Sequence, residues 1–405
     1  MEIRLTQSMI KMARQRLRGV IHCTPLDFSA TFSRLTGSQV YLKLENLQKT
    51  GSFKIRGAYN KICTLDDASR EKGVIAASAG NHAQGVAYAA RHAGIKSFIV
   101  MPESASISKV VATQGYGAQI FLAGEDYDQA YTHALVLQKE TNAIFVHSFD
   151  DPDIIAGQGT IALELLAALP DLEAIVVPVG GGGLIAGIAF AVKTHKPAVK
   201  VFGVQSKSAP AVYLLFRKKE TTELSKAHTI ADGIDVHRPG KLTFEFISRY
   251  VDDLVLVDEE EIAEAILLLL ERSKIMVEGA GAVGLAALLH GKISLPAKKV
   301  VVILSGGNVD TNIISIIIER GLVKSGRRLI VSVTIPDQPG SLAQLLILLA
   351  GARANLISIS HERIMPEVPL KEAQVNLVLE TRDQAHLNLI LDVLAKGGYR
   401  AKKHF

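Results

Sequence analysis

The sequence predicts an α/β protein with two lobes, followed by a small separate domain. Between residues 72 and 304, short apolar runs alternate with helical segments, which is typical of parallel sheets joined by right-handed crossovers. After a basic segment at residues 324–328, the pattern changes to strand, helix, strand, strand, helix, strand, the order of a ferredoxin-like domain. We therefore expect a main domain at residues 1–323, a linker at 324–328 and a tail domain at 329–405.

The composition excludes several classes of protein. Hydrophobic residues make up 48% of the 405 positions and charged residues 21%, as in soluble globular proteins. The net charge of +5 comes without a dense basic tract, so we expect no nucleic-acid partner. Cys23 and Cys63 do not have metal-ligand spacing and no H-x-x-x-H pair occurs, so we expect no metal site. The first 20 residues lack the apolar segment of an export signal, which predicts a cytoplasmic protein.

The smaller lobe is predicted at about residues 50–149. Its strands are expected at residues 74–77, 98–100, 118–122 and 144–146, and its helices at 81–92, 108–113 and 127–139. Gly94 follows the first of these helices, where a glycine commonly ends a helix in the left-handed conformation. Open α/β folds bind ligands at the carboxyl ends of their strands, so we expect the functional residues in the loops that follow strands.

The larger lobe is predicted at about residues 1–49 and 150–323. Its helices are expected at residues 155–169, 184–192, 259–271 and 280–290, and its strands at 174–179, 200–204 and 300–304. The uncharged run at residues 174–192 is nearly long enough to cross a membrane. Pro178 and the glycines at 180–183 break it into a strand, a turn and a helix, so we expect it to be buried and expect no membrane partner.

The tail domain alternates in a different order. Strands are expected at residues 329–335, 356–364 and 374–380, helices at 341–350 and 384–395, and a short strand closes the chain. Pro336, Pro339 and Gly340 predict a turn before the first of these helices.

The first candidate for chemistry is Lys54, in the string Ser52-Phe53-Lys54. Small and apolar neighbours help to desolvate a lysine, which lowers the pKa of its amine and makes it nucleophilic. Such an amine suits a Schiff base with a carbonyl group. The alternative is an ordinary surface lysine.

The second candidate is the turn Ser78-Ala79-Gly80-Asn81, between a predicted strand and a predicted helix. Free N–H groups at a helix N-terminus are a natural seat for a carboxylate. The Asn81 amide can also donate to a phenolate oxygen. The alternative is simple capping of the helix by Ser78 or Asn81.

The third candidate is the glycine loop, which we define as Gly180, Gly181, Gly182 and Gly183, followed by Leu184. Consecutive glycines let the backbone approach a phosphate and aim N–H groups at it. A packing turn and a dinucleotide site are the alternatives. A dinucleotide site requires an acid about 20 residues later, but Gln205 stands at the end of the next strand. The loop therefore suits a phosphate of mononucleotide size.

The fourth candidate is Ser305, which follows the apolar strand at residues 300–304 and places a hydroxyl at its carboxyl end. By itself, Ser305 could belong to an ordinary turn. A lysine, a carboxylate seat, a phenolate donor, a phosphate loop and a hydroxyl together describe a site for pyridoxal 5'-phosphate.

With these motifs the chain resembles the fold type II pyridoxal-phosphate enzymes, whose fold is tryptophan synthase β-like. Within them it is similar to the threonine dehydratases, also called threonine ammonia-lyases, over residues 5–323. The resemblance is carried by Lys43-Leu44-Glu45-Asn46, Gly51-Ser52-Phe53-Lys54, Ala77-Ser78-Ala79-Gly80-Asn81-His82-Ala83-Gln84-Gly85, Pro178-Val179-Gly180-Gly181-Gly182-Gly183-Leu184, Ala231-Asp232-Gly233, Glu278-Gly279-Ala280-Gly281-Ala282 and Ser305-Gly306-Gly307-Asn308.

The resemblance implies a role for each of these residues. Lys54 would hold the cofactor and then take the substrate's Cα proton. Phe53 would pack beside the cofactor ring, Asn81 would hydrogen-bond its 3' oxygen, and Ser305 would face its pyridine nitrogen. The phosphate would bind to the glycine loop and Leu184. The substrate carboxylate would bind to Ser78, Ala79, Gly80 and Asn81.

The resemblance also implies a reaction. A neutral hydroxyl such as that of Ser305 does not keep the pyridine nitrogen protonated, so the ring is a weaker electron sink and β-elimination is favoured. The expected activity is a lyase that converts L-threonine to 2-oxobutanoate and ammonia, and L-serine to pyruvate. Serine racemases carry a second serine where Ala79 stands, and acidic metal ligands where residues 205–211 have none. The alternatives are a β-replacement synthase and a non-catalytic amino-acid sensor.

The tail resembles an ACT domain, a ligand-binding module of amino-acid metabolism. This resemblance implies an effector site formed by Asp337, Gln338, Gly340, Ser341 and Leu342 with Asn355, Leu356 and Ile357. Allosteric feedback by isoleucine, as in isoleucine biosynthesis, is the family expectation, with valine and serine as alternatives. The chain has one such module, so a shared effector site requires a homo-oligomer, a tetramer or a dimer. The alternative is a domain for dimerisation alone.

Overall fold

The computed structural model describes residues 5–219, 229–364 and 368–404, and the chain divides into two compact units, Met1–Asp310 and Thr311–Phe405. Helix α14 (Thr311–Lys324), which the pattern did not predict, belongs to the second unit. Strand β11 (Arg328–Pro336) begins at the last residue of the expected linker. The segment expected as a linker is therefore a short turn between α14 and β11. The first unit ends at Asp310, before residue 323, where the main domain was expected to end.

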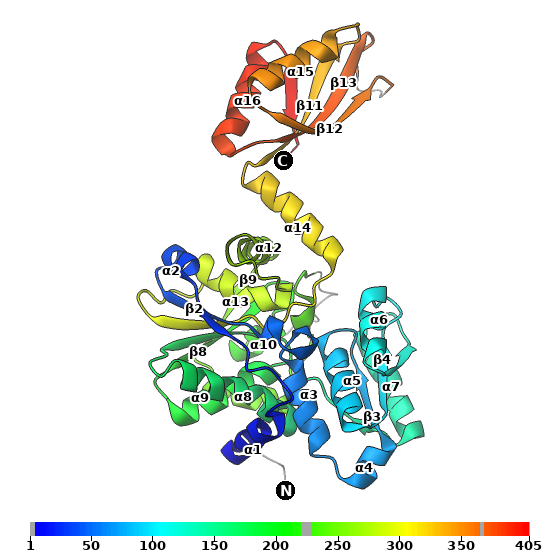
Figure 1. The fold of residues 1–405 in the computed structure, drawn as a ribbon, viewed down its shortest axis with the longest axis vertical. Helices are drawn as coiled ribbons and strands as arrows, with labels where there is room; N and C mark the ends of the chain where they lie inside the picture. The colour runs from blue at the N-terminus through cyan, green and yellow to red at the C-terminus, as the bar shows by residue number, and fades with distance from the viewer. Residues whose placement is uncertain (1–4, 220–228, 365–367, 405) are drawn as a thin grey trace. The chain divides into compact units, whose positions relative to one another are not determined.

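The larger lobe of the first unit is built on a six-stranded sheet in the order β1-β2-β10-β7-β8-β9 (Figure 1). β1 pairs with β2 antiparallel, and the other neighbouring strands are parallel. β7 is buried along its whole length, which explains its unbroken apolar sequence. The strands are β1 (Leu26–Phe28), β2 (Gln39–Lys43), β7 (Ala174–Pro178), β8 (Lys200–Ser206), β9 (Asp253–Val257) and β10 (Lys299–Ile303).

Helices cover this sheet, and glycines let two of them pack closely. A Cβ at Gly187 would lie 2.5 Å from the carbonyl of Ile155, so α8 and α9 approach each other backbone to backbone. The helices of the lobe are α1 (Gln7–Leu17), α2 (Ala30–Thr36), α8 (Pro152–Ala168), α9 (Gly183–His195), α10 (Ala211–Phe216), α11 (Lys241–Tyr250), α12 (Glu259–Leu268) and α13 (Gly279–Leu289). The helix expected at residues 259–271 is α12 continued by one π-helical turn, Leu269–Ser273.

The smaller lobe has a four-stranded parallel sheet in the order β5-β4-β3-β6. Its strands are β3 (Val74–Ala77), β4 (Ser97–Met101), β5 (Gln119–Leu122) and β6 (Ile144–Phe145), as the alternation predicted. Its helices are α3 (Lys54–Cys63), α4 (Asp67–Lys72), α5 (Asn81–Ala93), α6 (Ile107–Gly115) and α7 (Tyr127–Thr141). α3 packs against α5 and also against α8 of the larger lobe, so it joins the two lobes.

The second unit carries a four-stranded antiparallel sheet in the order β12-β13-β11-β14. Its elements are β11, α15 (Ser341–Gly351), β12 (Asn355–Glu362), β13 (Glu372–Glu380), α16 (Gln384–Lys396) and β14 (Arg400–Lys403). This confirms the predicted order of strands and helices. Alternate residues of β11 and β13 pack with α15 and α16 into one apolar core.

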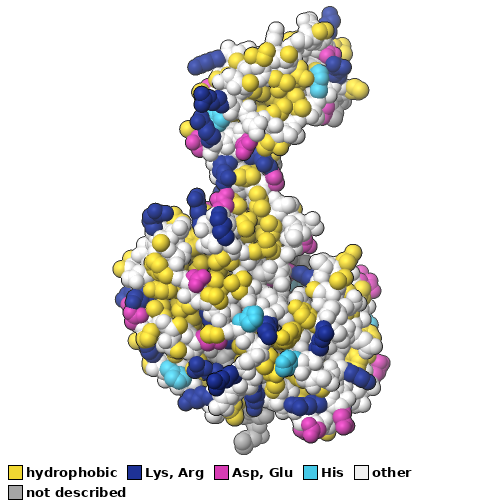
Figure 2. Space-filling view, viewed as in Figure 1, with side chains coloured by type: hydrophobic (Ala, Val, Ile, Leu, Met, Phe, Trp, Pro, Cys, Tyr) yellow, Lys and Arg dark blue, Asp and Glu magenta, His cyan; other side chains and the backbone are white. Residues whose placement is uncertain are grey.

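No helix among the described residues combines the length and the apolarity that crossing a membrane requires. On the face of the first unit drawn in Figure 2, basic and acidic side chains are scattered among polar and apolar ones.

A buried cluster of charges fixes α3 to the larger lobe. Arg56 is fully buried and donates to both oxygens of Glu45, at 2.7 and 2.8 Å. Its Nη1 also donates to Glu164 of α8 at 2.6 Å, and Lys43 of β2 pairs with the other oxygen of Glu164 at 2.6 Å. The two carboxylates hold the pKa of Arg56 above its ordinary value, against the effect of burial. Two cations are thus balanced by two anions around the first turns of α3.

We predict that Arg56→Ala lowers the free energy of unfolding of the full chain by about 3–5 kcal/mol in urea denaturation, because it leaves Glu45 buried without its cation. Lys207→Ala is the matched control, since Lys207 and Asp258 form a half-exposed pair at 3.1 Å. We expect the control to lower it by about 0–1 kcal/mol. Equal losses in the two variants would contradict the role given to the buried cluster.

Candidate active site

The four predicted motifs meet at the carboxyl ends of β3, β7 and β10. The turn that contains Asn81 follows β3, the glycine loop follows β7, and Ser305 follows β10. Lys54 is the first residue of α3. The Ser305 carbonyl accepts the N–H of Phe53 at 3.1 Å, which attaches the Lys54 segment to the end of β10. The structure therefore brings together motifs that lie up to 250 residues apart in the sequence.

Lys54 points to the junction of the two lobes. Its Nζ donates to the Ser148 carbonyl at 3.0 Å and lies 5.4 Å from the centre of the Phe53 ring. Burial lowers the pKa of Lys54 to about 8, although the charge of Glu278 opposes the shift. A substantial share of the amine is therefore neutral and nucleophilic near neutral pH.

Two histidines near Lys54, the buried His82 and the half-buried His147, are uncharged. Burial, with the nearby Lys54 charge, lowers the pKa of His82 to about 3. The pKa of His147 is also lowered, chiefly by burial. The Nδ1 atom of His147 accepts the N–H groups of Phe149 and Asp150, at 3.2 and 2.8 Å, so it carries no proton. These imidazoles therefore shape the site without adding positive charge.

The glycine loop packs against Phe149, the residue after the carbonyl that accepts Lys54. A Cβ at Gly181 would overlap the Phe149 ring, and a Cβ at Gly183 would lie 3.0 Å from the backbone of Phe149. Gly182 has a φ of +95°, which favours glycine, and caps α9. Thr243 holds the loop by donating to the Gly181 carbonyl at 2.7 Å. The first N–H groups of α9 lack partners within the helix, as an anion site requires.

The predicted carboxylate seat is the turn into α5. The Ser78 hydroxyl accepts the Gly80 N–H at 3.2 Å, and Gly80 is the residue before the helix. Neither Ser78 nor Asn81 is the N-cap of α5, which corrects the capping alternative. A Cβ at Gly80 would meet nothing within 4 Å, so the backbone there faces open space.

Asn81 lies between two polar side chains to which no role was assigned in advance. Its Nδ2 donates to Glu278 at 2.7 Å, and its Oδ1 accepts from Asn308 at 2.7 Å. Burial and the charge of Asp232 raise the pKa of Glu278 to about 8, although the hydrogen bond from Asn81 opposes the shift. Glu278 and Asn308 belong to glycine-containing motifs that the sequence analysis quoted, so a polar side chain next to glycines could have pointed to them. The contact with Ser148 could not be predicted in this way, because Ser148 uses only its backbone carbonyl.

These residues fit pyridoxal 5'-phosphate. Lys54 offers a partly neutral amine, the glycine loop offers a cradle that side chains would fill, and Asn81 donates only one of its two amide N–H groups, to Glu278, among the described residues. Ser305 is 3% exposed and contributes a neutral hydroxyl at the end of β10. The Lys54 amine suits the carbonyl group of the cofactor, and the glycine loop suits its phosphate. The Asn81 amide suits the phenolate oxygen, and the Ser305 hydroxyl suits the pyridine nitrogen.

Comparison with known proteins leads to the same cofactor. A family profile described as "Pyridoxal-phosphate dependent enzyme" matches residues 17–306. The chain belongs to this family. L-threonine ammonia-lyase from Thermotoga maritima is 51% identical to this pyridoxal-phosphate enzyme over 398 residues, 98% of this chain and 99% of the relative. L-threonine ammonia-lyase from Geobacter sulfurreducens is 47% identical over 395 residues, 98% of each chain.

A solved structure gives the same fold for the first unit of this pyridoxal-phosphate enzyme. Maize serine racemase superposes with a TM-score of 0.74 at 36% identity, covering 80% of this chain and 99% of the racemase. The first unit thus has the fold type II architecture predicted from the sequence.

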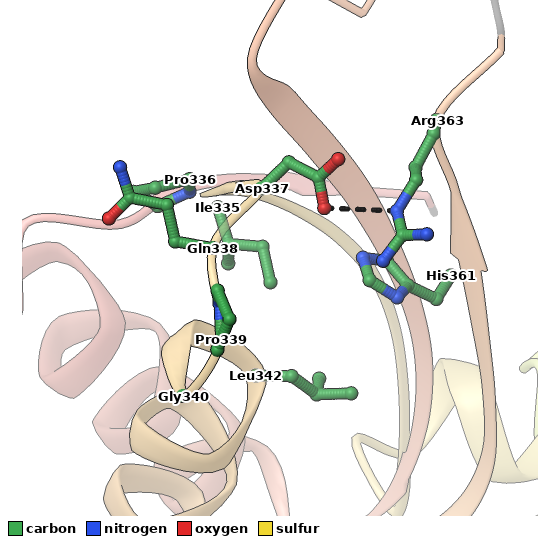
Figure 3. A pocket seen from close by; sticks show the side chains of 9 residues that line it. All are labelled: Ile335, Pro336, Asp337, Gln338, Pro339, Gly340, Leu342, His361 and Arg363. Atoms are coloured by element: carbon green, nitrogen blue, oxygen red, sulfur yellow. Dashed lines mark ion pairs between the residues drawn. The ribbon is translucent and has the colours of Figure 1, made fainter.

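The second unit contains a cavity of about 350 Å³ beside the turn before α15 (Figure 3). Four of the predicted effector residues line it: Asp337, Gln338, Gly340 and Leu342. The other five lining residues were not predicted: Ile335, Pro336, Pro339, His361 and Arg363. Arg363 Nε lies 2.9 Å from Asp337 Oδ1, and Figure 3 shows this pair facing each other, with the Gln338 side chain turned away from it.

The other predicted effector residues lie elsewhere in the same copy. Ser341 begins α15 next to the turn but does not line the cavity. Asn355, Leu356 and Ile357 begin β12, whereas His361 lies near its end. Because β11 and β12 both run antiparallel to β13, the cavity is at the opposite end of β12 from Asn355. Within one copy of the chain, the predicted effector residues of the turn at 337–342 therefore lie apart from those at 355–357.

We predict that Gly181→Ala weakens cofactor binding about 10- to 100-fold in a titration of cofactor-free enzyme, because the new Cβ collides with the Phe149 ring and displaces the loop. Gly115→Ala is the matched control, since a Cβ there meets nothing within 4 Å. Wild-type affinity in Gly181→Ala would show that the glycine loop does not hold the cofactor.

Proposed function

We propose that this pyridoxal-phosphate enzyme is a threonine ammonia-lyase, which converts L-threonine to 2-oxobutanoate and ammonia and acts on L-serine as a second substrate. The observation that carries the proposal is the buried Lys54 amine, held at 3.0 Å from the Ser148 carbonyl. The relatives that share nearly the whole length of the chain are L-threonine ammonia-lyases, which supports this choice of substrate.

Bound pyridoxal phosphate draws electrons away from Cα of an amino acid and so makes its proton removable. The N–H groups of the turn at residues 78–81 bind the substrate carboxylate and orient Cα toward Lys54. The Lys54 amine takes the Cα proton. The hydroxyl group at Cβ leaves with its bonding electrons and takes up a proton, which the Lys54 ammonium group can return, to form water. The released enamine hydrolyses to 2-oxobutanoate and ammonia.

Two residues favour elimination over racemisation. Ala79 has no proton to deliver to the face of Cα opposite Lys54, whereas a serine at this position would have one. The Ser305 hydroxyl does not hold the pyridine nitrogen protonated, so charge at Cα is best removed by loss of the β-substituent. Both features direct the site to a lyase.

We predict that Lys54→Ala lowers 2-oxobutanoate release from L-threonine by about 1,000-fold or more, because the only proton acceptor that we assign at Cα is lost. The 2-oxo acid is measured with L-threonine and with L-serine. Lys61→Ala is the control and should retain activity, because it removes a half-buried lysine farther along α3 that pairs with Asp151 and Asp153. Threonine turnover by Lys54→Ala at the wild-type rate would refute the proposal.

We also propose that the second unit is an ACT domain that binds an amino-acid effector in the cavity of Figure 3. Arg363 and Asp337 present opposite charges 2.9 Å apart, which match the carboxylate and the ammonium group of an amino acid. Ile335 and Leu342 supply an apolar wall for its side chain. Isoleucine fits this chemistry, and valine and serine are the alternatives.

A homo-oligomer would complete that effector site. β12 is an edge strand whose Leu356, Ile357 and Ile359 are between 37% and 46% exposed. An edge with apolar side chains is suited to pair with a second chain. Antiparallel pairing along β12 would bring Asn355 of one copy beside the end of β12, and so beside the cavity, of the other. A dimer, or a tetramer that contains such dimers, would therefore let the start of β12 take part in the effector site.

We predict that Arg363→Leu raises the effector concentration needed for half-maximal response at least about tenfold and leaves basal activity unchanged, because the carboxylate loses its charged partner. Threonine turnover is titrated with isoleucine, valine and serine. Arg382→Leu, an exposed arginine outside the cavity, is the control. A wild-type response in Arg363→Leu would exclude this cavity as the effector site.

A further inference from the structure

The side-chain amide of Asn81 is fixed at both of its polar atoms. Its Oδ1 accepts one hydrogen bond from Asn308 Nδ2, and its Nδ2 donates one to Glu278 Oε1, each at 2.7 Å. An asparagine amide carries two N–H donors. One N–H of Asn81 therefore remains for a ligand at the site.

The direction of this chain of hydrogen bonds is set by a backbone carbonyl. Asn308 Nδ2 also donates to the Thr50 carbonyl at 2.7 Å. A carbonyl only accepts, so turning over the Asn308 amide would place two oxygens against each other. The orientation of Asn308 then decides that Oδ1 of Asn81 faces Asn308, and that Nδ2 faces Glu278. Thr50 lies four residues before Lys54, so the Lys54 segment itself sets the orientation of Asn81.

Two glycines make room for the two supporting side chains. A Cβ at Gly51 would overlap Asn308, and a Cβ at Gly306 would overlap Glu278 Oε1. Glu278 is 4% exposed, and its own N–H donates to the Gly306 carbonyl at 3.1 Å. Glu278 and Asn308 are therefore built into the strand end that carries Ser305.

We propose that Glu278 and Asn308 are positioning residues, which hold the Asn81 amide so that its remaining N–H is aimed at the ring oxygen of pyridoxal phosphate. Neither side chain needs to touch the reacting atoms, because each acts through Asn81. The proposal rests on the cofactor and does not depend on threonine being the substrate.

Glu278 supplies an acceptor rather than a charge. The groups whose charges reach it are Lys54, Asp232 and Lys109, and burial with Asp232 raises its pKa to about 8. It is thus largely protonated at neutral pH, and its carbonyl oxygen accepts from Asn81. A glutamine has the same shape and also offers a carbonyl oxygen, so it should serve in place of Glu278.

The test compares holoenzymes of Glu278→Ala, Glu278→Gln and Asn308→Ala by the visible absorption of the bound cofactor, which responds to the hydrogen bond at its ring oxygen and requires no substrate. Cofactor affinity is measured in parallel. Asn60→Ala is the matched control, because Asn60 is a buried asparagine with two side-chain hydrogen bonds, to Arg16 and to the Asp153 carbonyl. Far-ultraviolet circular dichroism checks that each variant is folded.

We expect a displaced absorption band and about 5- to 100-fold weaker cofactor binding in Glu278→Ala and in Asn308→Ala. We expect Glu278→Gln and Asn60→Ala to keep the wild-type band. A wild-type band and wild-type affinity in Asn308→Ala would overturn the proposal. A Glu278→Gln enzyme as impaired as Glu278→Ala would also overturn it, because Glu278 would then act through its charge and not by accepting the hydrogen bond from Asn81. Failure to turn over threonine would leave these spectra unaffected, so the two proposals fail separately.

Discussion

Removal of the Lys54 amine from water is the constraint on which the rest of the site depends. Burial favours the neutral form of an amine, and here it lowers the pKa of Lys54 to about 8. The neighbours preserve that effect, since His82 is uncharged and Glu278 is largely protonated at neutral pH. A permanently ionised carboxylate beside Lys54 would have reversed it. The site thus keeps a nucleophile ready in a buried position by limiting the charge around it.

The same burial requires that Lys54 be held by packing and backbone contacts. Its segment is attached to the end of β10 through Phe53 and Ser305, and its helix is fixed two residues later by the pairing of Arg56 with Glu45 and Glu164. That cluster joins α3, a helix of the smaller lobe, to the larger lobe. The charged side chains of this cluster are paired with one another, whereas the residues proposed to receive the cofactor are glycines, a neutral hydroxyl and a neutral amide.

Much of this arrangement could be predicted from the sequence because it follows from local patterns. Alternating strands and helices placed Asn81, the glycine loop and Ser305 at strand ends, and the structure confirms those positions. α11 and β9 were not predicted, although each carries a signal: apolar residues recur at helical spacing within Lys241–Tyr250, and Asp253–Val257 contains four consecutive apolar residues. The Ser148 carbonyl and the Phe149 ring were missed because their contacts with Lys54 and Gly181 depend on tertiary packing. In the tail, Asp337 and Leu342 were predicted from the resemblance to an ACT domain, but His361 and Arg363 reach the cavity only through the pairing of β12 with β13.

The most direct test of this account is the pKa of Lys54 itself, measured by NMR titration of cofactor-free enzyme labelled with ¹³C at the lysine side chains. Lys54→Arg identifies the signal by its absence. The account predicts a pKa of about 8, so that about a quarter of the amine is neutral at pH 7.5, against about one part in a thousand at the ordinary value of 10.5. A Lys54 signal that titrates at 10.5 or above would contradict the central claim, because the amine would then be charged and unreactive throughout the neutral range.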